Sequence, residues 1–214
     1  MTEERYPDIS SVTTKDTWEH VYKPDVDTYL LMDVLTQDKE FIEQHHPFTS
    51  LEIGCGSGIV TEHIHRLFPK VQTFCSDINP YALKCTQQVH PTGNIIKSSL
   101  IESIRDESVD LFIYNPPYVP TPSEEMNHSY IALSWAGGKD GREKIDCVIE
   151  RLWDILSPEG IAYMVVIQDN NPIEIMKLAA KHNLKPKVMD SIGLQTEKLY
   201  ILRFTPIFEL IENN

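Results

Sequence analysis

The segment Leu51-Glu52-Ile53-Gly54-Cys55-Gly56-Ser57-Gly58 leads directly into residues 59–67, whose apolar side chains recur at helical spacing. A strand, a glycine loop and a helix in this order are typical of an α/β domain with a parallel sheet. Three glycines in alternate positions let a backbone approach a ligand closely. The loop differs from the dinucleotide fingerprint, whose third glycine comes later, and from a phosphate-cradling loop, since no Lys-Ser/Thr pair follows.

An acidic residue follows the second predicted strand. Residues 71–76 read as that strand, and Asp77 stands at its tip, about 20 positions after the glycine loop. A carboxylate in this place accepts hydrogen bonds from both hydroxyls of a ribose. The acidic Glu52 beside the loop suits a cationic rather than an anionic cofactor. The two features together predict a nucleoside ligand without a pyrophosphate.

A third feature is the tetrapeptide Asn115-Pro116-Pro117-Tyr118, which closes the apolar run Val109–Tyr114. Proline lacks a donor for a sheet ladder and restricts the residue before it, so Asn115 is held rigidly at the strand's carboxyl end, where open α/β sheets bind ligands. The Asn115 side-chain oxygen and the Pro116 carbonyl would hold a planar NH2 group, with the Tyr118 ring over its plane. Such acceptors expose the nitrogen lone pair to an electrophile in line. For the bare tetrapeptide, a plain turn is an equal alternative.

Taken together, residues 52–58, Asp77 and residues 115–118 resemble the motifs of class I S-adenosylmethionine-dependent methyltransferases that act on amide or amino nitrogen. More narrowly, residues 21–31 and 134–143 resemble segments of the eukaryotic and archaeal release-factor glutamine methyltransferases. The resemblance covers nearly the whole chain.

The resemblance implies methyl transfer from S-adenosylmethionine to the amide N5 of the glutamine in the Gly-Gly-Gln motif of class I translation termination factors. It implies catalytic roles for Asn115, Pro116 and Tyr118, and substrate contacts from Asn115, Pro116, Pro117 and Tyr118. The implied cofactor-binding residues are Thr28, Glu52, Gly54, Gly56, Gly58, Asp77, Ser99, Leu100 and Asn115. Eukaryotic members of the family work as heterodimers with a small zinc-binding activator protein.

This sequence departs from the family pattern in two places. Lys23 and Val26 stand where relatives usually carry glutamates, while Asp27 and Thr28 remain to meet the cofactor. Ser99 stands where many relatives have an aspartate that faces the adenine amino group. The adenine contact would therefore rest on the Ser99 hydroxyl or on backbone.

Strands and helices alternate along the chain, which predicts a doubly wound, mainly parallel seven-stranded sheet with right-handed crossovers. The predicted helices are residues 27–35, 59–68, 80–89, 142–156 and 172–181, and the predicted strands are 48–54, 71–76, 94–97, 109–114, 161–167, 187–191 and 198–204. The resemblance implies that the last strand is antiparallel. Residues 157–160 read as a turn before the fifth strand.

Asn94–Lys97, the third predicted strand, falls at the edge of such a sheet. An apolar edge beside the cofactor pocket is a place where another chain adds a strand. The resemblance implies that the added chain is the small zinc-binding activator protein.

The segment between Asn115 and Arg142 is long for a loop and contains Trp135, Gly137 and Gly138. Long loops are often functional, so Trp135 would form a wall or lid of the site. Alternatively, the Trp135 side chain has only a structural role and attaches the loop to the core. The sequence does not distinguish these two roles.

Composition predicts one globular domain, since 214 residues with 41% hydrophobic and 24% charged side chains are enough for a substantial core. We expect a tail over residues 1–20 and a single methyltransferase domain over residues 21–214. No stretch approaches a membrane span, and the start lacks the apolar core of a signal peptide. The four cysteines show no paired metal spacing, so no metal site is predicted, and they read as reduced, buried thiols of a cytoplasmic or nuclear protein.

Net charge is −13, from 19 basic and 32 acidic residues. Such a surface repels a phosphate backbone and favours a protein substrate. The alternative function is an adenine-N6 methyltransferase of DNA or RNA, which the same tetrapeptide serves, but no residues remain for a separate recognition domain. A third hypothesis, a non-catalytic cofactor-binding scaffold, conflicts with the intact Asn115 and glycine loop.

Overall fold

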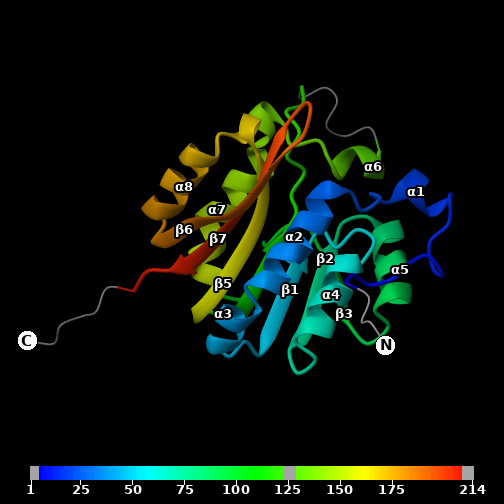
Figure 1. The fold of residues 1–214 in the computed structure, drawn as a ribbon, viewed down its shortest axis with the longest axis horizontal. Helices are drawn as coiled ribbons and strands as arrows, with labels where there is room; N and C mark the ends of the chain where they lie inside the picture. Colours follow the sequence, from blue (N-terminus) through cyan, green and yellow to red (C-terminus); the bar gives the residue numbers. More distant parts are fainter. Residues whose placement is uncertain (1–4, 123–128, 209–214) are drawn as a thin grey trace, which may run out of the picture.

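The computed structural model describes residues 5–122 and 129–208, which fold around one seven-stranded sheet (Figure 1). The strand order across the sheet is β3-β2-β1-β4-β5-β7-β6. The strands are β1 (Thr49–Ile53), β2 (Gln72–Asp77), β3 (Asn94–Lys97), β4 (Val109–Tyr114), β5 (Leu156–Ile167), β6 (Leu184–Gly193) and β7 (Lys198–Pro206).

The pairs that β1, β2, β3, β4 and β5 form with one another are parallel, and β7 runs antiparallel to both β5 and β6. The predicted fold class, with its antiparallel last strand, is therefore confirmed. Chain order reverses between β1 and β4, which makes their carboxyl ends the topological switch point where such sheets bind ligands.

The helices are α1 (Thr17–His20), α2 (Val26–Gln37), α3 (Lys39–Gln44), α4 (Ile59–Leu67), α5 (Pro80–Val89), α6 (Tyr130–Leu133), α7 (Glu143–Ile155) and α8 (Pro172–Lys181), with 3-10 turns η2 (Lys139–Gly141) and η3 (Gln168–Asn170). The chain marks several helix starts locally. The Asn79 side chain accepts from Tyr81 N at 3.0 Å, and Pro80 occupies the first turn of α5. None of the helices in the described residues is long and apolar enough to cross a membrane.

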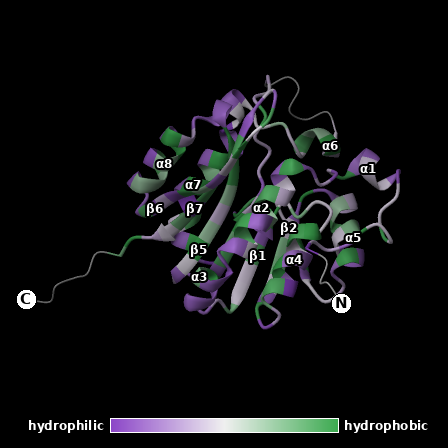
Figure 2. Ribbon diagram, viewed as in Figure 1, coloured by the Kyte–Doolittle hydropathy of each residue, from purple (hydrophilic) through white to green (hydrophobic). Residues whose placement is uncertain are grey.

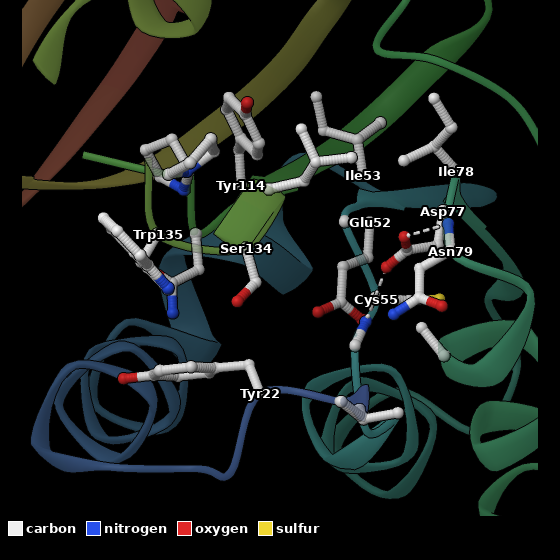
Figure 3. A pocket seen from close by; sticks show the side chains of 18 of the residues that line it. Tyr22, Glu52, Ile53, Cys55, Asp77, Ile78, Asn79, Tyr114, Ser134 and Trp135 are labelled. Carbon is white, nitrogen blue, oxygen red and sulfur yellow. Dashed lines mark hydrogen bonds between the residues drawn. The ribbon is translucent and has the colours of Figure 1, made fainter. Parts of the chain in front are cut away.

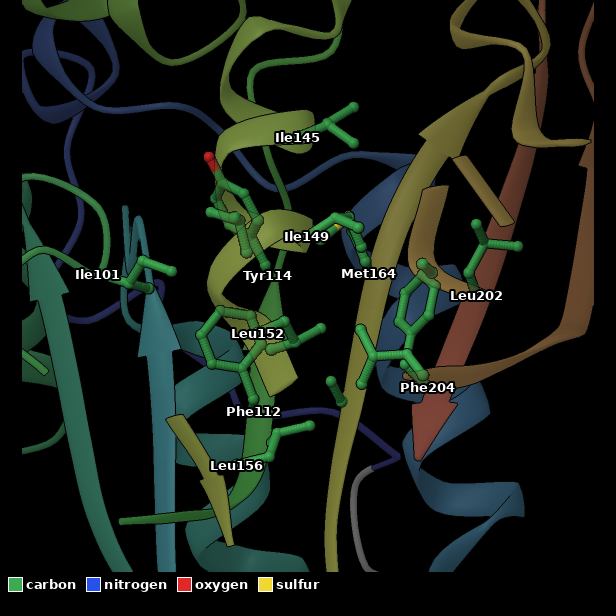
Figure 4. Close-up of a cluster of buried hydrophobic side chains, with 14 of the residues drawn as sticks. Ile101, Phe112, Tyr114, Ile145, Ile149, Leu152, Leu156, Met164, Leu202 and Phe204 are labelled. Carbon is green, nitrogen blue, oxygen red and sulfur yellow. The ribbon is translucent and has the colours of Figure 1, made fainter. Parts of the chain in front are cut away.

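Both faces of the sheet are covered, which explains why residues 111–114 of β4 are apolar and buried without interruption. Leu111 and Ile113 point into the cluster formed with α2, α3 and α4, whereas Phe112 and Tyr114 point into the cluster formed with α7 and α8 (Figure 4). The covering helices carry both hydrophobic and hydrophilic residues (Figure 2), as expected where one side of a helix faces the core.

The described part of the predicted tail packs on the domain. Tyr6 donates from its hydroxyl to Asp33 Oδ1 on α2 at 2.7 Å, and Ile9 belongs to the buried cluster that α2 and α4 share. These contacts hold residues 5–9 against the helices. Residues 1–4 lie outside the described part of the chain.

The structure corrects three expectations. Helices α1, α3 and α6 were not predicted, because four to six residues are too few to show a helical period. The strand β5 already begins at Leu156, which pairs with Val109, and pairing resumes at Ile161, so the predicted turn over residues 157–160 lies within the strand. Cys55, Cys75 and Cys85 are buried as expected, but Cys147 is exposed.

Candidate active site

A pocket of about 430 Å³ lies at the carboxyl ends of β1, β2 and β4, a volume suited to a small organic ligand. Parallel strands bring these three ends together although they are far apart in the sequence. The predicted site residues that line the pocket are Thr28, Glu52, Gly54, Gly56, Asp77, Ser99, Leu100, Asn115, Pro116, Pro117 and Tyr118. In Figure 3, Glu52, Asp77 and Asn79 gather on one side of the pocket, and Tyr22 and Trp135 on the other.

The glycine loop leaves space beside the end of β1. Gly54 and Gly56 have φ angles of +69° and +51°, a backbone conformation that residues with a side chain rarely adopt. The nearest atom to a Cβ placed on Gly54 would be Tyr114 Cε2, 4.0 Å away. The Gly54 and Cys55 amides both donate to Ser76 O, at 2.8 and 3.0 Å, so the loop is fixed to β2. A ligand can therefore lie against a rigid backbone.

Gly58 is the predicted cofactor-binding residue that the structure does not place among the lining residues. It precedes α4 with a φ of +81°, and an added Cβ would lie 2.8 Å from Thr86 Cα on α5. The glycine at this position permits close packing of the two helices.

Asp77 is held by backbone amides at the end of β2. Its Oδ2 accepts from Gly56 N at 3.0 Å and its Oδ1 from Asn79 N at 2.8 Å. Burial raises the pKa of this carboxyl, while the amide donors oppose the shift. An ionised carboxylate offers about four acceptor positions. Asp77 can therefore also accept from hydroxyl groups of a ligand in the pocket.

Glu52 is a buried acid, and within residues 5–122 and 129–208 it has no cationic partner. It is 4% exposed, and Thr61 on α4 donates from its hydroxyl to Glu52 Oε2. None of the ion pairs among the described residues includes Glu52. Burial therefore raises the pKa of this carboxyl well above its usual 4.5. A cationic ligand beside it would stabilise the charged form, which fits a sulfonium cofactor.

Asp27, on the first turn of α2, holds the residues of the Asn-Pro-Pro-Tyr corner (residues 115–118). Its Oδ2 accepts from Asn115 Nδ2 at 2.9 Å and from the Tyr118 hydroxyl at 3.2 Å. Its Oδ1 accepts from the Tyr22 hydroxyl at 3.1 Å and from Thr28 N at 2.7 Å. The resemblance implied that Asp27 would meet the cofactor. In the structure Asp27 lines the pocket, and its carboxylate also fixes the side chains of the corner.

Asn115 Oδ1 is buried and has no hydrogen-bond partner among the residues that the structure describes. Because Nδ2 donates to Asp27, the orientation of the amide is fixed and the oxygen stays an acceptor. A buried acceptor without a donor costs free energy, so such groups in proteins call for an explanation. An NH2 group bound in the pocket beside Asn115 would supply the missing donor.

The two tyrosines beside Asp27 remain neutral phenols. Burial first, and the Asp27 charge second, raise the pKa values of Tyr118 and Tyr22. Both hydroxyls therefore donate to Asp27 throughout the physiological range, and neither can act as a general base.

We call residues 135–141 the glycine strap. Within it, Trp135 both lines the pocket and lies in a segment that is attached to the rest of the domain. Its side chain is 37% exposed and lines the pocket, so it forms part of the wall. Its carbonyl accepts from Val119 N at 2.9 Å, and Gly137 N donates to Val119 O at 2.9 Å, so the strap is also pinned to the chain that follows the corner. Residues 123–128 of this loop lie outside the described residues.

Several lining residues were not predicted, among them Tyr22, Asn79, Ser134 and Glu197. Glu197 comes from the turn between β6 and β7, and burial together with Asp27, Asp169 and Asp25 raises its pKa. Tyr22 stood in the segment that carried the resemblance, so its position was a usable signal. Nothing in the local sequence around Glu197 marks it as part of a site.

A family model described as the methyltransferase small domain matches residues 20–132. The chain belongs to this family. It is therefore a methyltransferase, and S-adenosylmethionine is its cofactor. Methyltransferase HEMK2 of Homo sapiens is 35% identical over 200 residues, which cover 89% of this chain and 92% of that protein.

The family's other relatives agree with this assignment. The eRF1 methyltransferase catalytic subunit mtq2 of Schizosaccharomyces pombe is 32% identical over 195 residues, which cover 82% of this chain and 84% of that protein. Among solved structures, the E. cuniculi Mtq2–Trm112 complex, described as responsible for methylation of the eRF1 translation termination factor, matches with a TM-score of 0.69. Identity there is 28%, over 87% of this chain and 99% of that one.

Proposed function

We propose that this methyltransferase modifies the glutamine of the Gly-Gly-Gln motif in the class I translation termination factor, at the side-chain amide N5. The observation that carries the proposal is Asn115 Oδ1, a buried acceptor at the pocket that has no donor among the described residues and that a substrate NH2 group would satisfy. The described functions of the Schizosaccharomyces pombe and E. cuniculi relatives support the same substrate.

The pocket offers distinct places for the parts of the cofactor. In the proposal, Asp77 accepts from the ribose hydroxyls, Gly54 and Gly56 allow close approach, and Ser99 and Leu100 border the adenine. Thr28 and Glu52 lie on the lining as well, and Glu52 faces the cationic part. The bound cofactor supplies a methyl group on a positively charged sulfur.

The corner holds the glutamine. Asn115 Oδ1 and the Pro116 carbonyl accept from the two amide hydrogens, while Pro117 and Tyr118 complete the wall against which the flat amide lies. These acceptors orient the nitrogen lone pair toward the electrophile. The nitrogen gains a methyl group and then loses one proton to solvent, so no side chain needs to act as a strong base. Asp27 prevents rotation of the Asn115 amide.

We propose further that a small zinc-binding partner adds to the β3 edge. β3 pairs with β2 and is the last strand on this side of the sheet, and its Ile96 side chain is 41% exposed. Ile78, next to the end of β2, and Tyr81, in the first turn of α5, are also exposed. An open strand edge beside exposed apolar side chains fits the addition of a strand from another chain. The Mtq2 relative of known structure is in complex with Trm112.

The proposal also covers the domain boundaries and the cellular compartment of the protein. Residues 21–214 form the methyltransferase domain and residues 1–20 a segment that precedes it. The protein works in the cytoplasm, and also in the nucleus.

The test compares three substrates with one enzyme preparation. The protein, co-expressed with its partner, is incubated with S-adenosylmethionine and a purified termination factor, a duplex oligonucleotide that contains adenine, or bulk protein. Mass spectrometry should find one methyl group on the Gly-Gly-Gln glutamine. Methylation of adenine, with an unmodified termination factor, would reject the proposal in favour of a nucleic-acid methyltransferase. Asn115→Ala is the control for background methylation.

A further inference from the structure

We propose that Asn170 is a positioning residue of this methyltransferase, which fixes the Asn-Pro-Pro-Tyr corner through the Tyr118 carbonyl. Asn170 ends η3, directly after β5, and is completely buried. It is not among the residues that line the pocket, so its effect must pass through the corner. The inference rests on the proposed function only for the kinetic part of its test.

The hydrogen bonds of Asn170 explain why this residue is an asparagine. Its Oδ1 accepts from Ile167 N at 2.9 Å, a local contact that aspartate would make equally well. Its Nδ2 donates to Tyr118 O at 2.7 Å and to Asp140 O at 3.0 Å. These two carbonyls come from segments 52 and 30 positions away. The amide NH2 is therefore specified by tertiary contacts and not by the turn in which it lies.

The two carbonyls converge because the glycine strap packs directly on the corner. A Cβ on Gly141 would lie 1.9 Å from Tyr118 O and 2.5 Å from Asn170 Nδ2. A Cβ on Gly137 would lie 2.5 Å from Pro117 O. Buried backbone carbonyls need a hydrogen-bond donor, and the Asn170 NH2 group supplies one to Tyr118 O and one to Asp140 O.

The corner depends on such contacts more than an ordinary loop does. Pro116 and Pro117 have no backbone N–H, so two of the four residues of the corner offer no amide donor. The corner is therefore held largely through its side chains, which Asp27 contacts, and through its carbonyls. Asn170 and Asp27 therefore hold Tyr118 from opposite ends, by its carbonyl and by its hydroxyl. A shift of Tyr118 would move the Asn115 acceptor relative to the cofactor.

The decisive variant is Asn170→Asp, which keeps the acceptor for Ile167 N and places an oxygen where Nδ2 faces two carbonyls. We expect kcat to fall about tenfold or more, because small displacements of a reacting group are costly, while the Kd for S-adenosylmethionine stays within about threefold. Asn170→Ser, which retains one donor, should give an intermediate kcat. It also serves if the aspartate variant does not fold.

The matched control is Asn171→Ala. Asn171 has a φ of +54° and its side chain caps α8, so its loss destabilises the same turn without touching the corner. We expect a lower Tm with unchanged kcat. If Asn170→Asp folds, binds cofactor and turns over like the wild type, or if kcat falls equally in the Asn171 variant, the positioning role is rejected.

A second readout does not need the substrate. The side-chain NH2 of Asn115 gives nitrogen-15 NMR signals, which Asn115→Ala identifies by their disappearance. Asn170→Ser should shift or broaden these signals, and Asn171→Ala should not. Unmoved signals in the Asn170 variant would overturn the inference. An unmodified termination factor with the wild-type enzyme would instead refute the proposed function.

Discussion

Asp27 Oδ2 accepts a hydrogen bond of 2.9 Å from Asn115 Nδ2, across 88 positions of sequence. The contact joins the first turn of α2 to the end of β4 and determines which way the Asn115 amide points. The NH2 group is therefore occupied, whereas the oxygen has no partner in the part of the chain that the structure describes. The acceptor of the site is therefore oriented before any ligand binds.

Asp27→Asn should reduce turnover at least tenfold, because the new amide cannot accept from both Asn115 and Tyr118 as well as a carboxylate does. The Asn115 amide would then lose its fixed orientation. The measurement is kcat with the termination factor, alongside the Kd for S-adenosylmethionine. Asp25→Asn, two residues earlier on the exposed N-cap of α2, is the matched control and should keep wild-type kcat.

Asn115→Ala should leave cofactor affinity within a few fold and lower turnover by about a hundredfold, since a nucleophile misplaced by about an ångström reacts that much more slowly. Asn115→Asp is the sharper variant. Its carboxylate can no longer donate to Asp27 and places a like charge beside it, so catalysis should fall at least as far as in Asn115→Ala. Mass spectrometry of the termination-factor glutamine measures turnover, and calorimetry measures binding. A near wild-type rate in Asn115→Ala would reduce the corner to a turn.

Asp77→Ala should weaken S-adenosylmethionine binding by well over tenfold, since it removes hydrogen bonds to a charged group that contribute about 1.5–3 kcal/mol each. Calorimetric titration of the folded variant gives the affinity directly. Asp106→Ala, which removes an exposed carboxylate paired with Arg151, should bind the cofactor like the wild type. Unchanged affinity in Asp77→Ala would remove this residue from the site.

Glu52→Gln should make the cofactor-free protein more stable at neutral pH. The pKa of Glu52 is raised well above 4.5 in the folded state, so the acid form is favoured there. As pH rises above 4.5, the unfolded chain loses its proton first, and the free energy of unfolding falls until the folded carboxyl also titrates. Glutamine, which cannot ionise, escapes this loss.

The stability difference between Glu52→Gln and the wild type should therefore grow from pH 4.5 toward neutrality, as measured by thermal unfolding across that range. The gain in Tm on adding S-adenosylmethionine should be smaller in the variant, because its site lacks the carboxylate that meets the cation. Equal pH profiles for the two proteins would contradict an uncompensated buried acid at Glu52. Burial raises the pKa of Asp77 too, and the Asp77 charge is one of the causes that raise the pKa of Glu52.

Ile96→Asp should abolish binding of the small partner, because it places a charge on the exposed edge of β3. The protein expressed alone should be poorly soluble and hold cofactor weakly. Val188→Asp, on the exposed opposite edge of the sheet in β6, is the control and should leave the complex intact. Co-purification with the partner is the measurement. Fully soluble and active protein without a partner would contradict the idea.

Local pattern was enough for the principal strands and helices. The ranges Asn94–Lys97, Val109–Tyr114 and Pro172–Lys181 were predicted to the residue, because prolines, polar caps or an abrupt change of hydropathy mark their ends. Helix α3 was not predicted, because it is too short to show the helical period of apolar residues. The start of β5 at Leu156 was not predicted either, because a register shift against β4 follows it.

The chemical groups of the site could be recognised from local sequence patterns. Glycines after β1, an acid after β2 and Asn-Pro-Pro-Tyr after β4 are local signals, and parallel pairing places all three at one edge of the sheet. Tertiary structure decided how these groups are used. Gly58 allows α4 to pack closely against Thr86 of α5, and Asp27 accepts the hydrogen bond that orients Asn115. Asn170 reached Tyr118 from 52 positions away. Such roles depend on which distant segments come into contact in the folded chain. No local periodicity in the sequence shows those contacts.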